Sequence, residues 1–98
     1  MITTNNTERN GPIGTIEKAI GIYGAEAQEN QCIEECAELI QAINKKHRGC
    51  EHNIIEEIAD VEIMLEQLKI INCCRADVER IKQEKIQRLA ERLKHYDI

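Results

Sequence analysis

The fold is decided by two stretches of similar pattern, Ile33–Ala42 (IEECAELIQA) and Ile55–Leu65 (IEEIADVEIML). In both, apolar residues recur every three or four positions, which is the spacing of one face of an α-helix. Each stretch also carries two acids three residues apart, and residues at that spacing lie one turn apart on the same face. The pattern predicts two amphipathic helices that each carry a pair of carboxylates beside the apolar face.

Outside these stretches the same periodicity predicts an all-α protein of four helices. Gly24 and Gly49 indicate helix boundaries, and Thr15 and Asn53 are candidate N-caps. The short links between helices predict a compact bundle in which consecutive helices are antiparallel neighbours. The predicted helices span residues 16–22, 25–47, 53–71 and 77–95, in a single domain at 12–98 that follows a flexible tail at 1–11.

Composition narrows the class of protein. The chain has 98 residues and neither Trp nor Phe, so we expect a small aliphatic core. The net charge of −5 argues against non-specific binding to nucleic acid, which needs a basic surface. No apolar run is long enough for a membrane span, so we expect no membrane partner. The five cysteines include no CxxC pair and predict reduced thiols in a cytoplasmic protein.

The third predicted helix has a second apolar strip, formed by Ala59, Ile63 and Ile70, on the side away from Glu57. A helix that is apolar on two sides contacts more than one neighbour. A chain of this size buries only a modest fraction of its surface. We therefore expect the second neighbour to be another copy of the chain, in a homodimer or a homotetramer.

Four acids, Glu35, Glu38, Glu57 and Asp60, abut the apolar stripes of their two helices. A carboxylate in such a stripe is costly unless a cation or strong donors meet it. Two helices packed face to face would gather all four, and such a set of oxygen ligands favours Mg²⁺, with Mn²⁺ as a substitute. The alternative is that the four are ordinary solvated acids, the commonest fate of charges on helices.

The order of these acids resembles that of a known family. Glu34–Glu38 (EECAE), followed after eighteen residues by Glu57–Asp60 (EIAD), is similar to the EExxE…ExxD signature of the MazG-like all-α nucleoside triphosphate pyrophosphatases. The resemblance extends over residues 16–93. It implies that the predicted bundle has the fold of that family.

The resemblance also implies an activity, hydrolysis of a nucleoside triphosphate between the α and β phosphates to give the monophosphate and pyrophosphate. Carried over by position, Glu35, Glu38, Glu57 and Asp60 would hold Mg²⁺, with Glu35 and Glu38 in the catalytic group. Glu34 would orient or activate the attacking water. Cleavage of this kind depends mainly on positioning and on neutralising charge, and the sequence offers no competing Ser-His or Cys-His nucleophile pattern.

Cations on the fourth predicted helix are candidates for binding the phosphates. Lys85 and Arg92 project near its apolar arc and Arg88 borders it. Such side chains commonly cover apolar surface with their stems while the charge reaches water, so a phosphate clamp and simple surface cover both remain open. Lys45, on the Glu38 side of the second helix, is a further candidate.

Three residues are candidates for reading the base. Gln28 and Gln31 lie on the Glu35 side of the second helix, one to two turns earlier, and their amides match the donors and acceptors of a nucleobase edge. Tyr23 can stack on a base. The alternatives are surface hydrogen bonding for the glutamines and a structural plug beside Gly24 for the tyrosine.

The sequence and this resemblance therefore predict a Mg²⁺-dependent nucleotide pyrophosphohydrolase that acts on a nucleoside or deoxynucleoside triphosphate. The resemblance alone implies that it serves to remove unwanted or surplus nucleotides. The alternative from another class is a non-catalytic helical module for oligomerisation or interaction, in which the acids form a vestigial or regulatory cation site.

Overall fold

The computed structural model describes residues 11–96, and all regular structure in that range is helical. The prediction of an all-α chain with four helices is confirmed. The predicted tail falls, except for Gly11, outside the described residues. The helices are α2 (Pro12–Tyr23), α3 (Ala25–His47), α4 (Ile54–Ile71) and α5 (Arg75–Leu93), followed by a short 3₁₀ turn, η1 (Lys94–Tyr96).

The start of α2 differs from the prediction. The helix begins at Pro12, which occupies the first helical position, where proline lacks only a donor that would be unpaired anyway. Thr15 is therefore inside the helix, where its Oγ1 donates to the Gly11 carbonyl oxygen at 3.2 Å. The prediction of Thr15 as N-cap was wrong because Pro12 is the stronger start signal.

The ends of α3 follow the predicted glycine signals. Gly24, with φ of 92°, separates α2 from α3, and Gly49, with φ of 75°, follows the last turn of α3. Asn53 precedes α4, as predicted, but its side chain does not cap the helix. Its Nδ2 instead donates to Glu57 Oε2 at 3.4 Å.

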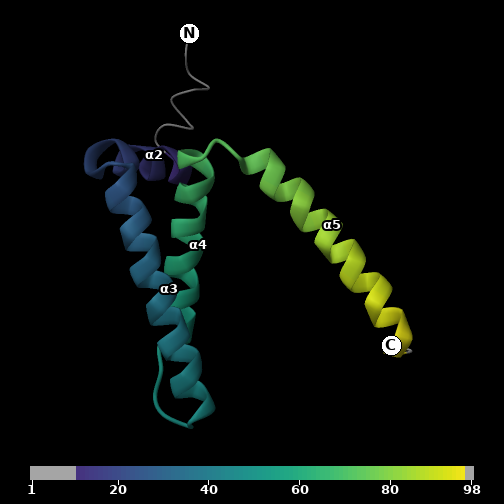
Figure 1. Ribbon diagram of the computed structural model, residues 1–98. Coiled ribbons are helices and arrows are strands. Elements are labelled where there is room, and N and C mark those ends of the chain that lie inside the picture. The colour runs from purple at the N-terminus through teal and green to yellow at the C-terminus, as the bar shows by residue number, and fades with distance from the viewer. Residues whose placement is uncertain (1–10, 97–98) are drawn as a thin grey trace.

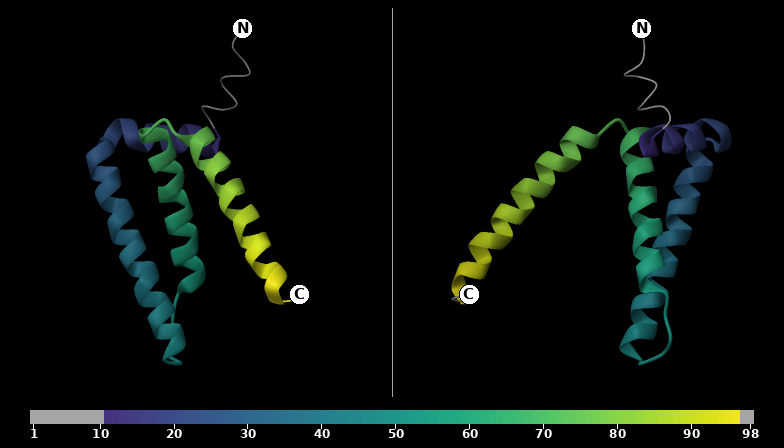
Figure 2. Two further views of the ribbon diagram at one scale, coloured as in Figure 1. Left: turned by 45° about the vertical axis from the view of Figure 1, so that its right-hand side comes forward. Right: turned by 180° about the vertical axis from the view of Figure 1, so that it is seen from behind.

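Three of the helices pack together and the fourth does not. α3 and α4 run antiparallel and side by side, and α2 lies across the end of this pair where α3 begins and α4 ends (Figure 1). Among the other α-helices of residues 11–96, α5 contacts α4 alone and then extends away, as the rotated views also show (Figure 2). The radius of gyration is 17.5 Å, against about 13 Å for a compact domain of this length. Within one chain the bundle therefore consists of α2, α3 and α4.

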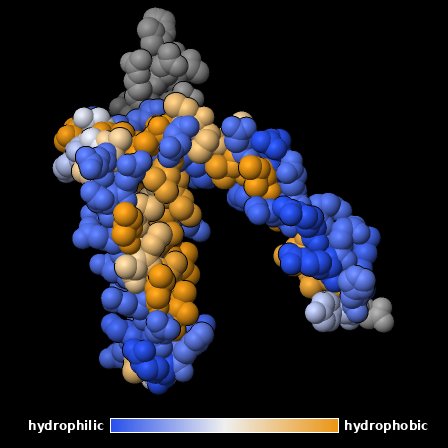
Figure 3. Space-filling view, viewed as in Figure 1, coloured by the Kyte–Doolittle hydropathy of each residue, from blue (hydrophilic) through white to orange (hydrophobic). Residues whose placement is uncertain are grey.

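The core of a single chain is small. The buried apolar residues among those described are Cys32, Ala42 and Met64, and no large side chain is fully buried. Many large apolar side chains are exposed, including Ile33, Ile40, Ile63 and Leu89. Figure 3 shows apolar side chains along the α3–α4 pair and on the side of α5 that faces it.

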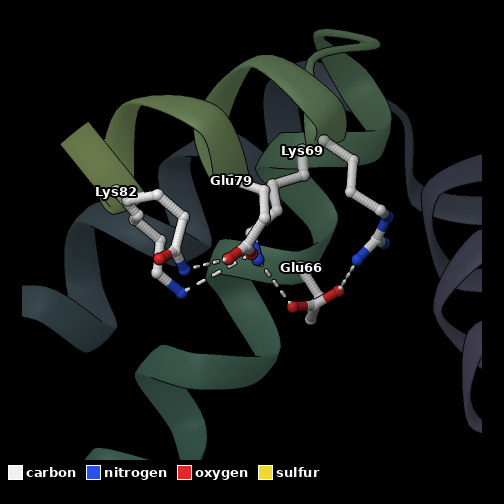
Figure 4. Close-up of polar contacts among 6 residues, drawn as sticks. Glu66, Lys69, Glu79 and Lys82 are labelled. Atoms are coloured by element: carbon white, nitrogen blue, oxygen red, sulfur yellow. Dashed lines mark hydrogen bonds and ion pairs between the residues drawn. The ribbon is translucent and has the colours of Figure 1, made fainter.

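The corner between α4 and α5 is held by charge pairs around Glu66. Its carboxylate accepts from Lys69 Nζ at 2.9 Å and from Arg75 Nη1 at 2.7 Å, which joins the last turns of α4 to the first residue of α5. These pairs lower the pKa of Glu66. Figure 4 shows Glu66 beside Lys69, and on α5 Glu79 beside Lys82. Cys73, in the link, has a φ of 50°, in the left-handed region.

No helix within residues 11–96 combines the length and apolarity that a membrane crossing requires. The five cysteines are free thiols; Cys32 is buried and Cys36 is half-buried beside it. Cys32 and Cys36 therefore act as small apolar residues of the α3 face.

Candidate functional site

The antiparallel packing of α3 against α4 brings the predicted acids together. Carboxylate oxygens of Glu35, Glu57 and Asp60 lie within 4.8 Å of one another. Glu38, one turn beyond Glu35, is close enough to hydrogen-bond with both Glu35 and Glu57. The structure thus gathers all four residues into one group, hereafter the acid cluster.

The acid cluster is part of a longer polar seam between the two helices. On each helix the residues at positions i, i+3, i+7 and i+10 share the face that meets the other helix. Seven of these eight side chains are polar. The seam consists of Gln28, Gln31, Glu35 and Glu38 on α3, and of Glu57, Asp60, Met64 and Gln67 on α4.

Burial and mutual repulsion make two of these carboxylates, Glu35 and Glu57, hard to ionise. Burial, a hydrogen bond with Glu38 and the charges of Asp60, Glu38 and Glu57 raise the pKa of Glu35 to about 7. Burial and the charges of Glu38 and Asp60, with the hydrogen bonds that protonated Glu57 donates to Asp60 and Glu38, also raise the pKa of Glu57. Glu57 is only 6 % exposed. No lysine or arginine in the described chain forms an ion pair with the cluster.

The donor set fits a hard divalent cation. All four side chains offer oxygen atoms, the ligand type that Mg²⁺ and Mn²⁺ favour. Opposite ligands of an octahedral Mg²⁺ lie roughly 4.2 Å apart, twice the usual bond length, and the oxygens of Glu35, Glu57 and Asp60 span up to 4.8 Å. Small side-chain movements would close that difference, and water would fill the remaining positions.

The predicted base-reading residues also come together. Tyr23, Gln28 and Gln31 line one hollow of about 380 Å³ with Ala27 and Met64, one to two turns along the seam from the acid cluster. Gln28 is buried, whereas Gln31 and Tyr23 are exposed at its mouth. The hollow combines an aromatic ring, two amides and a thioether, which suits a flat heteroaromatic ligand.

One residue of the seam was not predicted. Gln67 is 4 % exposed, and its Oε1 has no hydrogen-bond partner among the described residues. A buried amide oxygen without a donor is costly. Its spacing from Asp60, seven residues along the same face of α4, was a signal that the sequence offered.

The predicted phosphate-binding cations are not at the acid cluster of the same chain. Lys85, Arg88 and Arg92 line one surface hollow on α5 together with Glu91, and they form no ion pair with any described residue. α5 carries them away from α3 (Figure 1). Lys45 is exposed in the last turn of α3, about 10 Å along the helix from Glu38.

Glu34, predicted to act on the attacking water, is exposed and points away from the seam by about 100° relative to Glu35. It contributes to the raised pKa of neither Glu35 nor Glu57. Its catalytic role stays a prediction.

Compared with models of protein families, with curated proteins and with solved structures, the chain matches none.

Proposed function

We propose that this protein is a Mg²⁺-dependent nucleoside triphosphate pyrophosphohydrolase, of the kind found in the MazG-like family, which its acid spacing resembles. The observation that carries the proposal is the convergence of Glu35, Glu38, Glu57 and Asp60 without a neutralising lysine or arginine among the described residues. Four adjacent carboxylates repel one another and a divalent cation is the simplest group that relieves this.

The residues divide into two parts along the seam. The acid cluster would hold Mg²⁺, which when bound neutralises phosphate oxygens and activates water. The hollow lined by Tyr23, Gln28 and Gln31 would take the base. Gln28 lies seven residues before Glu35 on α3, about 10 Å along the helix, so the two parts are separated along the axis as the phosphates and base of a nucleotide are.

A panel of canonical and modified nucleoside triphosphates, with pyrophosphate release as the measurement, tests the proposal. Glu38→Gln and Asp60→Asn should abolish release while circular dichroism shows the fold intact. Glu56→Gln is the matched control, because Glu56 is an exposed neighbour of Glu57 and its loss should leave release unchanged. Absence of release with every triphosphate, or wild-type turnover in Asp60→Asn, would reject the proposal.

The second candidate is a non-catalytic oligomerisation or interaction module. Its support is the number of large apolar side chains that a single chain leaves exposed. Calorimetry with Mg²⁺ and a non-hydrolysable triphosphate separates the two candidates. The enzyme should bind both, whereas an interaction module should not bind the triphosphate, even if its acids hold Mg²⁺.

A further inference from the structure

The part of α5 beyond its first turns packs on no other helix among residues 11–96. Every described residue from Glu79 to Tyr96 is exposed, and no residue of α5 is buried. Isolated helices of this length are marginal in water unless an apolar face is packed. The apolar face of α5 is well formed, and its exposed members include Ile81, Ile86, Leu89 and Leu93.

The surface that α5 faces is also uncovered. Ala59 and Ile63 of α4 line an open groove with Ile16 of α2 and Lys82 of α5. The prediction placed Ala59 and Ile63 in a second apolar strip; α2 covers it in part, and Ile63 remains 47 % exposed. Figure 3 shows the apolar sides of α5 and of the α3–α4 pair turned toward each other. Two apolar faces are therefore left without an occupant.

Charge complementarity favours docking of the basic α5 on the acidic remainder of a chain. The stretch 75–96 has seven basic and four acidic residues, whereas 11–72 has five basic and twelve acidic residues. Lys85, Arg88 and Arg92 are free of ion pairs within the described chain, and the acid cluster lacks cations. The two unbalanced groups lie on surfaces that do not meet in one chain.

Large apolar side chains are exposed on both surfaces, among them Ile63 on α4 and Leu89 on α5. A second copy can cover both surfaces symmetrically, since each chain offers both an α5 and an α4 strip.

We propose that α5 docks on a second copy of this chain, with its apolar face on the α4 strip around Ala59 and Ile63 and its cations beside the partner's acid cluster. Asp60 borders that strip, since it is next to Ala59 in sequence and one turn before Ile63 on an adjacent face. Lys85, Arg88 and Arg92 would then serve phosphates at the partner's site. Only this last clause rests on the proposed hydrolytic function.

The first test needs neither nucleotide nor metal. Chains labelled with ¹⁵N are mixed with unlabelled chains, unfolded and refolded together, and treated with a carbodiimide that joins lysine amines to nearby carboxylates. Mass spectrometry should find links between Lys82 or Lys85 and acids of α3 or α4 that combine a light and a heavy chain. Links confined to chains of one isotope, or a monomer mass for the wild type in light scattering, would overturn the proposal.

A matched pair of variants tests the docking face. Leu89→Glu places a charge on the apolar face of α5 and should weaken dimerisation at least tenfold in light scattering. Gln87→Glu makes a similar change on the opposite side of the same helix and should keep the wild-type mass. Equal masses for the two variants would contradict docking through this face. The cross-links are measured on the wild type, so they test the docking of α5 even if Leu89→Glu folds poorly.

Complementation tests the shared site. Asp60→Asn and the double variant Lys85→Met with Arg92→Met should each be inactive alone. Refolded together, they should recover about a quarter of wild-type pyrophosphate release, because half of the dimers are mixed and each mixed dimer has one intact site. If the cations acted in their own chain, mixing would restore nothing. If no protein releases pyrophosphate but mixed-isotope links form, the docking stands and the hydrolytic function fails.

Discussion

Raising the pH should destabilise this protein in the absence of divalent metal, and Glu35→Gln should remove most of that effect. Burial and neighbouring carboxylates raise the pKa of Glu35 from 4.5 to about 7. Between these values the folded state holds a proton that the unfolded state has lost. Because the folded state binds more protons there, the free energy of unfolding falls as the pH rises through this window.

The size of the effect follows from that difference. A rise in pKa from 4.5 to about 7 corresponds to roughly 3 kcal/mol between the two protonation states. The cluster is open to water on one side, so we expect screening to leave about 1–2 kcal/mol of this. Glu35→Gln should thus stabilise the apo protein by about 1–2 kcal/mol at about pH 8 and have little effect at about pH 5.

Urea unfolding followed by circular dichroism measures this, at one fixed protein concentration so that any dimer contributes equally. With a chelator present, the wild type should be less stable at about pH 8 than at about pH 5. Mg²⁺ should offset this loss of stability, adding about 1.4 kcal/mol to the free energy of unfolding when its concentration is ten times its Kd. Glu34→Gln is the control, because it removes the neighbouring charge outside the cluster. A wild-type stability that rises between these pH values, or an equal gain in Glu34→Gln, would refute the reasoning.

Four further substitutions test the scaffold by urea unfolding. Gln67→Met, which removes the unpartnered Oε1 at similar volume, should stabilise the protein by about 1 kcal/mol; a loss would mean that a donor meets this oxygen. Gly49→Ala should lower the free energy of unfolding by about 1 kcal/mol because φ is 75° there. Gly21→Ala, inside α2 with open space around it, should raise it by about 0.5–1 kcal/mol. Equal effects of the two substitutions would contradict the helix ends described above. Glu66→Gln should lower the free energy of unfolding by at most about 1 kcal/mol because Glu66 is partly exposed. The stability that ionised Glu66 gives the wild type should disappear as the pH falls through its lowered pKa. An effect of the substitution that persists in strong acid would show that charge is not its source.

Much of the fold could be predicted because its signals are local. Gly24 and Gly49 bound α3, and only glycine adopts their positive φ without strain. The start of α2 was missed because a proline at the first helical position was outweighed by a threonine that resembled a cap. The splay of α5 away from α4 could not be predicted, since a short link such as 72–74 most often packs the next helix back along the preceding one, and Cys73 gives no sequence sign of its φ of 50°.

The candidate site was predictable to the extent that helix periodicity fixes it. Spacing alone placed Glu35 and Glu38 on one face and Glu57 and Asp60 on another, and the helices then had only to pack on those faces. The position of Lys85 and the other cations depends on a contact between elements, or between chains, which periodicity does not encode. Gln67 was overlooked because glutamine is usually a surface residue.

The unequal packing of the helices has a consequence for how the chain folds. Most contacts among α2, α3 and α4 join helices that are adjacent in sequence, so little loop-closure entropy opposes them and this part should form rapidly in a first-order step. Beyond its first turns, α5 buries none of its apolar side chains against residues 11–72 of its own chain. Its final ordering should therefore be a second-order event, whose rate increases with protein concentration and sets the pace of assembly when the protein is scarce.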